Sequence, residues 1–205
     1  MAILKNIIFD LGGVLLNIDY NKTEQAFAKL GVTDFRLMYD QFSADDLFEK
    51  LETGSISARH FYETMIARDK ALTIDTITNS WNAMLMDFRI GSLSFLKNLA
   101  KKYDLYLLSN TNIIHKTRFD IQFTQETGKP SIDDYFKKVY YSHLVGLRKP
   151  NDDIFEFLLK DAGIKAGETL FIDDSYNNIE AARKFGIKTH LLLAGEKVEE
   201  LKIFI

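Results

Sequence analysis

Three apolar stretches of the sequence each end in polar residues whose types could support chemistry. Asp10 follows residues 3–9, Ser109 and Asn110 follow residues 104–108, and Asp173 and Asp174 follow residues 169–172. Short runs of this kind, rich in β-branched and aromatic residues, are typical of buried parallel strands. Parallel strands end at the same edge of a sheet, and open α/β sheets bind ligands there, so we expect the three polar groups to meet at one site.

The expected chemistry of this site follows from its carboxylates. The side chains of Asp10, Asp173 and Asp174 would repel one another unless a cation lies among them. Their oxygens are hard ligands, and the chain has no cysteine and only four scattered histidines, so Mg²⁺ fits better than zinc. Mg²⁺ usually keeps waters and a substrate phosphate among its ligands. The sequence therefore predicts a magnesium site.

Other residues near the strand ends would complete the site. Ser109 offers a small hydroxyl, and Lys149 offers a positive charge just before a predicted helix. Gly12 and Gly13 permit a tight turn that brings the backbone close to whatever Asp10 faces. Each feature alone has an ordinary explanation, since an aspartate after a strand often only caps a turn and polar pairs are common turn or helix-cap residues. Their combination at one sheet edge favours a functional site.

After the first strand the pattern becomes helical. Residues 21–87 predict short amphipathic helices and contain no convincing strand. Asn21 is the expected N-cap of the first helix, which runs through Leu30, and Asp75 is expected to start the last one. Apolar stripes on such helices usually form the core of a helix bundle, so we assign them no cofactor.

Helices and strands alternate along the rest of the chain, from Arg89 onward, and the last clear strand is expected to end at Leu193. This alternation predicts an α/β fold with a doubly wound, Rossmann-like parallel sheet. Residues 1–17 and 89–205 would form this core domain. Residues 18–88 would then be an all-helical cap domain, inserted after the first strand.

Composition narrows the class of protein. The chain has 205 residues, a formal net charge of −3 and no basic patch, so nucleic acid is not an expected partner. The absence of cysteine excludes disulfides and thiolate nucleophiles. No run approaches the roughly 20 apolar residues of a membrane span, and Asp10 interrupts the N-terminal apolar run, which predicts a strand rather than a signal peptide. We expect a cytoplasmic protein without a membrane partner, and the sequence leaves its oligomeric state open.

The motifs resemble those of the haloacid dehalogenase-like (HAD) hydrolase superfamily. The stretch from Phe9 to Val14 resembles the first motif of that family, Leu108-Ser109-Asn110 the second, Lys149-Pro150 the third and Asp173-Asp174 the fourth. The helical block at 18–88 is similar to the cap that one branch inserts after its first motif. The resemblance covers the whole chain and implies a phosphoric monoester hydrolase.

The resemblance also implies catalytic and substrate-binding roles. Asp10 would be the nucleophile that forms an aspartyl phosphate, which splits one difficult step into two. Ser109 and Lys149 would bind the phosphoryl oxygens and neutralise their charge. Asn110 would contact the phosphoryl group or the cap. The backbone of Gly12 and Gly13 would contribute amides to the same oxygens.

For the metal, the resemblance implies four residues. Asp10, the backbone carbonyl of Gly12 and Asp174 would hold Mg²⁺, and Asp173 would act through a water or behind the other ligands. The implied function is a Mg²⁺-dependent phosphatase of a small phosphorylated metabolite. The likeness of Leu-Ser-Asn-Thr-Asn and Gly-Leu-Arg-Lys-Pro to the branch of glucose-1-phosphate phosphatases implies a sugar phosphate.

One position departs from the common pattern of the family. Most of its phosphatases carry a second aspartate two residues after the nucleophile, where this chain has Gly12. General acid–base help is typically worth about 10²–10⁴ in rate. We therefore expect a preference for leaving groups that are stable as anions, such as an anomeric oxygen. Asp19 is a candidate substitute for the missing acid.

Two other functions stay open at this point. A haloacid dehalogenase would share the fold and also lack the second aspartate, but it has no need of the acidic fourth motif. A non-enzymatic member of the family would bind a phosphorylated ligand or a protein partner without turning it over. The sequence does not name the substrate.

Overall fold

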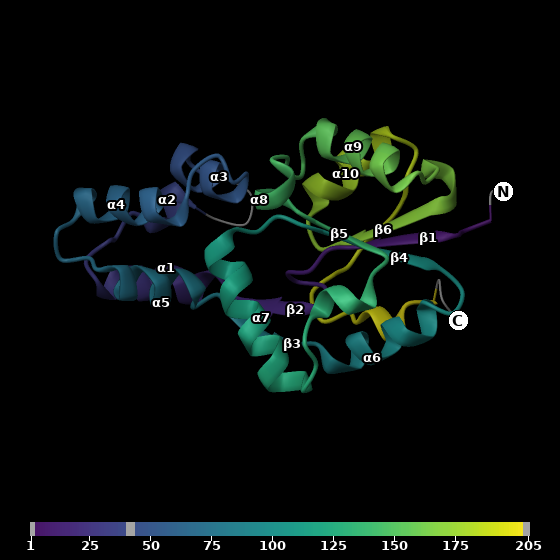
Figure 1. Ribbon diagram of the computed structural model, residues 1–205, viewed down its shortest axis with the longest axis horizontal. Coiled ribbons are helices and arrows are strands. Elements are labelled where there is room, and N and C mark those ends of the chain that lie inside the picture. The colour runs from purple at the N-terminus through teal and green to yellow at the C-terminus, as the bar shows by residue number, and fades with distance from the viewer. Residues whose placement is uncertain (1–2, 40–43, 203–205) are drawn as a thin grey trace.

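The core of the structure, a computed structural model that describes residues 3–39 and 44–202, is a five-stranded parallel sheet. Its strand order is β5-β4-β1-β6-β7, which puts the first strand at the centre (Figure 1). The strands are β1 Asn6–Phe9, β4 Asp104–Ser109, β5 Lys138–Tyr141, β6 Thr169–Asp173 and β7 Lys188–Leu191. The predicted doubly wound α/β fold is confirmed, although the last strand ends at Leu191 rather than at Leu193.

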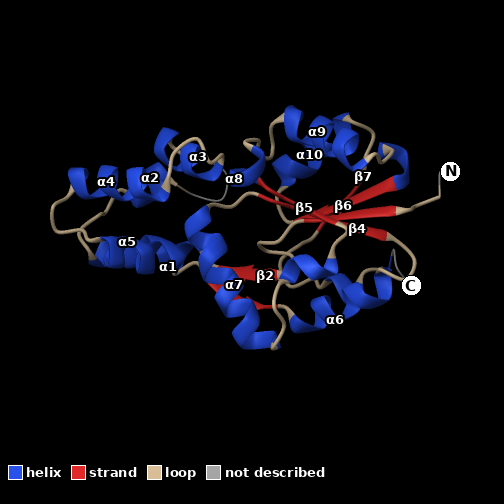
Figure 2. Cartoon of the chain, viewed as in Figure 1, coloured by secondary structure: helices blue, strands red, loops and turns tan. Residues whose placement is uncertain are grey.

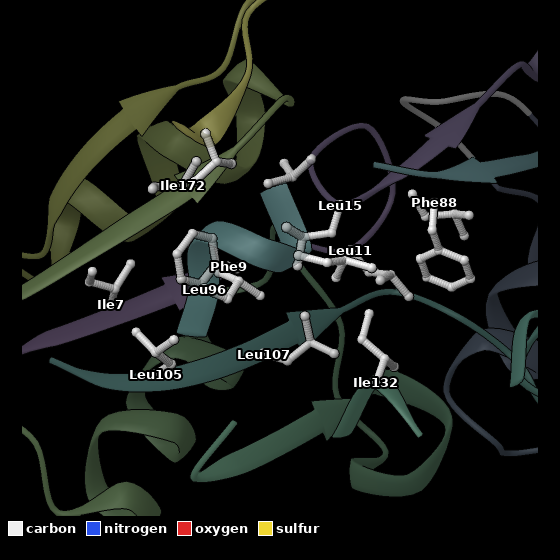
Figure 3. Packing of buried hydrophobic residues seen from close by; sticks show 14 of the residues in the cluster. Ile7, Phe9, Leu11, Leu15, Phe88, Leu96, Leu105, Leu107, Ile132 and Ile172 are labelled. Atoms are coloured by element: carbon white, nitrogen blue, oxygen red, sulfur yellow. The ribbon is translucent and has the colours of Figure 1, made fainter. Parts of the chain in front are cut away.

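Alternate residues of the central strand face two different hydrophobic cores, because side chains of a strand point to opposite faces in turn. Ile7 and Phe9 belong to the core beneath α6 and α7 (Figure 3), and Ile8 belongs to the core beneath α9 and α10. A strand covered on both faces is apolar at every position, which explains the continuous apolar runs. The helices of this part of the chain are α6 Ile90–Leu99, α7 Ile113–Thr127, α8 Ser142–Val145, α9 Asp152–Ala162 and α10 Tyr176–Lys184, with the 3₁₀ turns η1 Ile132–Tyr135, η2 Ala166–Glu168 and η3 Val198–Glu200 (Figure 2).

The register of the sheet aligns the polar strand ends. Phe9 is paired with Leu107 on one side and with Ile172 on the other. The backbone amide of Asp10 donates to the carbonyl of Ile172 at 2.9 Å, so Asp10 continues the line of the sheet beyond β1. Asp173 is therefore level with Asp10, and Ser109 lies one residue further along β4, so the polar strand ends meet at one edge as the sequence predicted.

A block of helices lies beyond this edge of the sheet (Figure 1). In the described residues it comprises α1 Tyr20–Lys29, α2 Phe35–Met38, α3 Asp46–Glu52, α4 Ala58–Arg68 and α5 Ile74–Asn82. Aromatic rings fill its interior around the fully buried Trp81, which the ring of Tyr39 meets edge to face at a centroid distance of 4.6 Å. This packing fixes Tyr39 beside the end of α3.

The prediction of no strand within residues 21–87 is wrong. A two-stranded antiparallel sheet forms from β2 Leu16–Ile18 and β3 Leu85–Phe88. Both strands are too short to stand out from a helical pattern, and they form because the two connections between the core and the helical block run side by side. The proposed boundary between a core and a cap domain passes through this pair.

Two predicted helix starts in the block are also wrong. The first helix is capped by Asp19, whose carboxylate accepts from the amide of Asn21 at 3.1 Å, so Asn21 lies inside the helix. The last one begins at Ile74, with Thr73 as its N-cap, rather than at Asp75. In both cases a residue with extended backbone and a side-chain oxygen stood one or two positions earlier than expected, and it supplies the cap.

Within residues 3–39 and 44–202, no helix is long and apolar enough to cross a membrane.

Candidate active site

A small cavity of about 90 Å³ lies where the sheet edge meets the helical block. From the core it is lined by Asp10, Gly12, Ser109, Asn110, Thr111, His115, Arg148, Lys149 and Asp174, among others. From the block and its connections it is lined by Ile18, Tyr20, Tyr39, Glu52, Met84 and Leu85. Of the site residues predicted from sequence, Gly13 and Asp173 lie behind this lining rather than in it.

Lys149 is the central charge of the site. Its Nζ lies 2.8 Å from Oδ1 of Asp10 and 2.7 Å from Oδ2 of Asp173. Only 1% of the Lys149 side chain is exposed. Burial disfavours the ammonium, but the two carboxylates outweigh that cost and raise the pKa of Lys149. The lysine therefore stays charged between two acids.

Asp173 is held on every side. It is fully buried, and besides Lys149 it accepts from the backbone amide of Ser175 at 2.8 Å. The side-chain amide of Asn178, in the first turn of α10, lies 3.0 and 3.1 Å from its two oxygens. With its oxygens used in this way, Asp173 orients Lys149 from behind the cavity.

Three carboxylates lie around the single ammonium group of Lys149. Asp10, Asp173 and Asp174 each place a carboxylate oxygen within 4.8 Å of the others. Burial raises the pKa of Asp10 to about 8, with Lys149 acting against burial and the charges of Asp173 and Asp174 adding to it. Burial, and then the charge of Asp173, raise the pKa of Asp174 to about 6. The group thus needs either bound protons or a further cation, and its oxygen donors fit a hard divalent ion such as Mg²⁺.

Gly13 serves the site in a way that the sequence did not predict. Its φ is +73°, and a Cβ there would lie 2.1 Å from Oδ2 of Asp174, so both backbone and space require glycine. Its amide donates to the carbonyl of Leu16 at 2.8 Å, so that amide is already used within the turn. The predicted contact of the Gly13 amide with substrate is therefore corrected: Gly13 makes room for Asp174.

Asn110 lines the cavity, so its predicted contact with the phosphoryl group or the cap stays a prediction, and its side chain has a further role. Its Nδ2 donates to the carbonyl of Lys149 at 2.8 Å, and the amide of Lys149 donates to its Oδ1 at 2.9 Å. The side chain of Asn110 thus clamps the backbone of the lysine from both sides. Ser109 is different, because its buried hydroxyl makes a single long contact of 3.4 Å and faces the cavity.

The structure gives no support to Asp19 as a substitute acid. Its carboxylate caps α1, and the described lining of the cavity includes the next residue, Tyr20, instead. Burial and the charges of Asp174, Asp10 and Glu52 all raise the pKa of Tyr20, so its phenol keeps its proton.

Sequence reasoning missed several residues of the cavity, above all Glu52. A weak signal was present, because Glu52 shares one face of α3 with Leu47, Phe48 and Leu51, all buried. A glutamate on an apolar helix face is rarely buried without a partner. That partner, Arg148, comes from the far end of the chain and has no local signal.

The comparisons with known proteins agree with this geometry. The family model for haloacid dehalogenase-like hydrolases matches residues 4–186. A D-ribitol-5-phosphate phosphatase of Bacteroides thetaiotaomicron is 36% identical over 188 residues, which cover 91% of this chain and 90% of that protein. A sesquiterpene phosphatase of Aspergillus oryzae is 39% identical over 190 residues, which cover 89% of this chain and 87% of that protein.

Among solved structures, the chain resembles a HAD family enzyme from Bacteroides thetaiotaomicron in complex with magnesium and inorganic phosphate. The wild-type protein of that structure is 34% identical, with a TM-score of 0.84 and coverage of 97% of this chain and 99% of that chain. Taken with the family model, which spans most of the sequence, this likeness shows that the chain belongs to the haloacid dehalogenase-like hydrolases.

Proposed function

We propose that the chain is a Mg²⁺-dependent phosphatase that hydrolyses a small phosphorylated metabolite through an aspartyl phosphate on Asp10. The observation that carries the proposal is the buried Lys149, held between Asp10 and Asp173 with Asp174 beside them. A nucleophilic carboxylate, a fixed cation and an acidic cluster are the parts that phosphoryl transfer needs.

Each residue then has a distinct task. Asp10 attacks phosphorus with a carboxylate oxygen, and the bond to the leaving oxygen breaks; water later cleaves the aspartyl phosphate and restores Asp10. Lys149 neutralises negative charge on the transferred group, and Asp173 keeps the ammonium in place. The hydroxyl of Ser109 and the backbone amides of Leu11 and Gly12 bind the phosphoryl oxygens.

Asp10, Asp174 and the carbonyl of Gly12 would hold Mg²⁺, since all three residues line the cavity. When bound, the ion draws negative charge from the phosphoryl oxygens and lets the carboxylates stay ionised together. We propose that Asp173 supports this site through Lys149 rather than as a ligand, because Lys149, Asn178 and the Ser175 amide take up its oxygens.

For the substrate we propose a phosphorylated sugar or polyol. Support comes from the relative that acts on D-ribitol 5-phosphate and from a glyceraldehyde 3-phosphate phosphatase of Methanocaldococcus jannaschii, 27% identical over 206 residues. The likeness of the motifs to glucose-1-phosphate phosphatases stays a prediction. A solved L-2-haloacid dehalogenase resembles the chain in fold alone, at 18% identity and a TM-score of 0.60.

The test is release of inorganic phosphate from a panel of phosphorylated sugars and polyols. We expect turnover with Mg²⁺, its loss in excess chelator, and its loss in Asp10→Asn with the fold intact by circular dichroism. Phosphate release that persists in excess chelator would contradict the metal-dependent mechanism. Halide release from 2-haloacids, without phosphate release from the panel, would favour a dehalogenase. Tight binding of phosphorylated compounds without turnover would favour a non-enzymatic role.

A further inference from the structure

A second buried carboxylate faces the cavity from the helical block. Glu52, at the end of α3, is 2% exposed. The hydroxyl of Tyr39 donates to its Oε1 at 2.8 Å, and Nη2 of Arg148 lies 3.1 Å from its Oε2. All three residues line the same cavity as Asp10 and Lys149.

Arg148 does not need Glu52 for charge balance. Its Nη1 also lies 3.9 Å from Glu49, whose side chain is half exposed and lies outside the cavity lining. Burial raises the pKa of Glu52, and Arg148 and Tyr39 act against that rise. A carboxylate in such a place costs stability relative to an apolar residue, because a buried ion pair seldom repays its desolvation. A role in binding would explain its presence.

The hydrogen-bonding capacity of Glu52 is only partly used. A carboxylate can accept about four hydrogen bonds, and among the described residues Oε2 of Glu52 has no hydrogen-bond partner of good geometry. Among the described residues, Nε of Arg148 and Nε2 of His115 are also buried without a hydrogen-bond partner. These atoms belong to residues that line one cavity.

His115 adds an acceptor to this group. Its Nδ1 lies 2.9 Å from Oδ1 of Asn82, an acceptor, so Nδ1 carries the hydrogen. Burial lowers the pKa of His115 to about 3, so the ring is neutral and Nε2 keeps its lone pair. The groups with hydrogen-bonding capacity left are then two acceptors, Glu52 Oε2 and His115 Nε2, and one donor, Arg148 Nε.

The geometry points to a leaving-group site for several hydroxyls. We propose that Glu52, positioned by Tyr39 and Arg148, accepts hydrogen bonds from hydroxyls of the substrate, with His115 as a second acceptor. The inference rests on the proposed phosphatase function and names the residues that would select its substrate: phosphate esters of sugars or polyols, rather than of apolar alcohols.

Other occupants fit these atoms less well. A second phosphate group would be repelled by Glu52, and an apolar chain would leave the remaining hydrogen-bonding capacity of Glu52, His115 and Arg148 unused, which costs binding free energy. Hydroxyls can donate to Glu52 and to His115 and accept from Arg148. Consecutive residues serve the two ends of the cavity, since Arg148 contacts Glu52 while Lys149 contacts Asp10. One short substrate can therefore touch both ends.

The experiment compares three substrates in wild type, Glu52→Gln and the control Glu49→Gln. D-ribitol 5-phosphate carries hydroxyls, pentyl phosphate has the same carbon chain without them, and acetyl phosphate is too short to reach Glu52. We expect Glu52→Gln to lower kcat/KM for D-ribitol 5-phosphate by about 10-fold to 100-fold, the usual worth of hydrogen bonds to a charged group. The other two substrates should change less than about twofold, and Glu49→Gln should change none of them.

Two results would overturn the inference. One is that wild type has the same kcat/KM for pentyl phosphate as for D-ribitol 5-phosphate. The other is that Glu52→Gln lowers kcat/KM equally for all three substrates. Melting temperatures of both variants separate such a fall from misfolding. Acetyl phosphate reports the phosphatase function by itself. If wild type hydrolysed none of the three, the proposed function would fail, and calorimetric binding of D-ribitol 5-phosphate to wild type and Glu52→Gln would still decide the role of Glu52.

Discussion

The two ends of the cavity each bury a carboxylate against a cation, yet the two pairs are built differently. At the sheet edge, Asp173 is surrounded by Lys149, Asn178 and the amide of Ser175. At the helical block, Glu52 has Tyr39 and a single arginine contact, and one of its oxygens lacks a well-formed hydrogen bond. A saturated pair can only position its neighbours, whereas an unsaturated pair has capacity left for a ligand.

The largest effect should come from breaking the pair of Asp173 and Lys149 at the sheet edge. Asp173→Asn removes the charge that holds Lys149 opposite Asp10. We expect kcat to fall by about 100-fold or more on every substrate, because a small displacement of a catalytic group is enough for that loss. The control is Asp152→Asn, the same change in a surface pair with Lys184, which should leave kcat within about twofold of wild type. A fall confined to hydroxylated substrates would contradict the division of roles.

A smaller effect should separate the two adjacent glycines. Gly13→Ala places a methyl group against Asp174 and strains a backbone with φ of +73°. We expect Mg²⁺ affinity, measured by calorimetry, to fall by more than about tenfold, since a ligand carboxylate must move. Gly12→Ala only crowds Cγ1 of Ile18 at 3.1 Å, so its affinity should change by less than about threefold. Equal losses in the two variants would mean that Asp174 does not bind the metal.

The cluster of Asp10, Asp173 and Asp174 should also make the stability of the metal-free protein depend on pH. Asp10 has a usual pKa of 3.8 that burial raises to about 8, so the folded protein keeps a proton that the unfolded chain releases. Stability should therefore fall as pH rises from about 4 to 8, and no further above that range. Melting temperatures in chelator across these pH values test this. In Asp10→Asn the slope should be flatter, and saturating Mg²⁺ should remove it; a melting temperature that rises with pH would contradict the assignment.

The smallest effect is expected at Asp19, which caps α1 and is not among the residues that line the cavity. Asp19→Asn keeps a good N-cap, so kcat/KM should change by less than about twofold. If leaving-group stability decides, wild type should also prefer glucose 1-phosphate to glucose 6-phosphate. Fast hydrolysis of the 6-phosphate that persists in Asp19→Asn would mean that another group of the cavity protonates the leaving oxygen.

The parts of the molecule that could be predicted from sequence are those with local signals. The strands β1, β4 and β6 are continuous apolar runs, and the residues just after them meet because parallel register is simple. Asp10, Ser109, Lys149 and Asp174 accordingly line one cavity.

Features that depend on distant contacts escaped prediction. The β2–β3 pair exists only because the two connections between the core and the helical block run side by side. The pairing of Glu52 with Arg148 depends on how the helical block meets the core, and no spacing along the chain encodes it. The use of Asn110 as a clamp on Lys149, and of Gly13 as space for Asp174, follows from contacts that a single sequence does not reveal.

The central claim is that Asp10 carries the phosphoryl group during turnover. Rapid quenching of the wild-type enzyme with a ³²P-labelled substrate and Mg²⁺, followed by peptide mapping, tests it directly. The account predicts an acid-stable, hydroxylamine-sensitive label on the peptide that contains Asp10, and no label in Asp10→Asn. Turnover without any labelled protein, or a label on another residue, would contradict it.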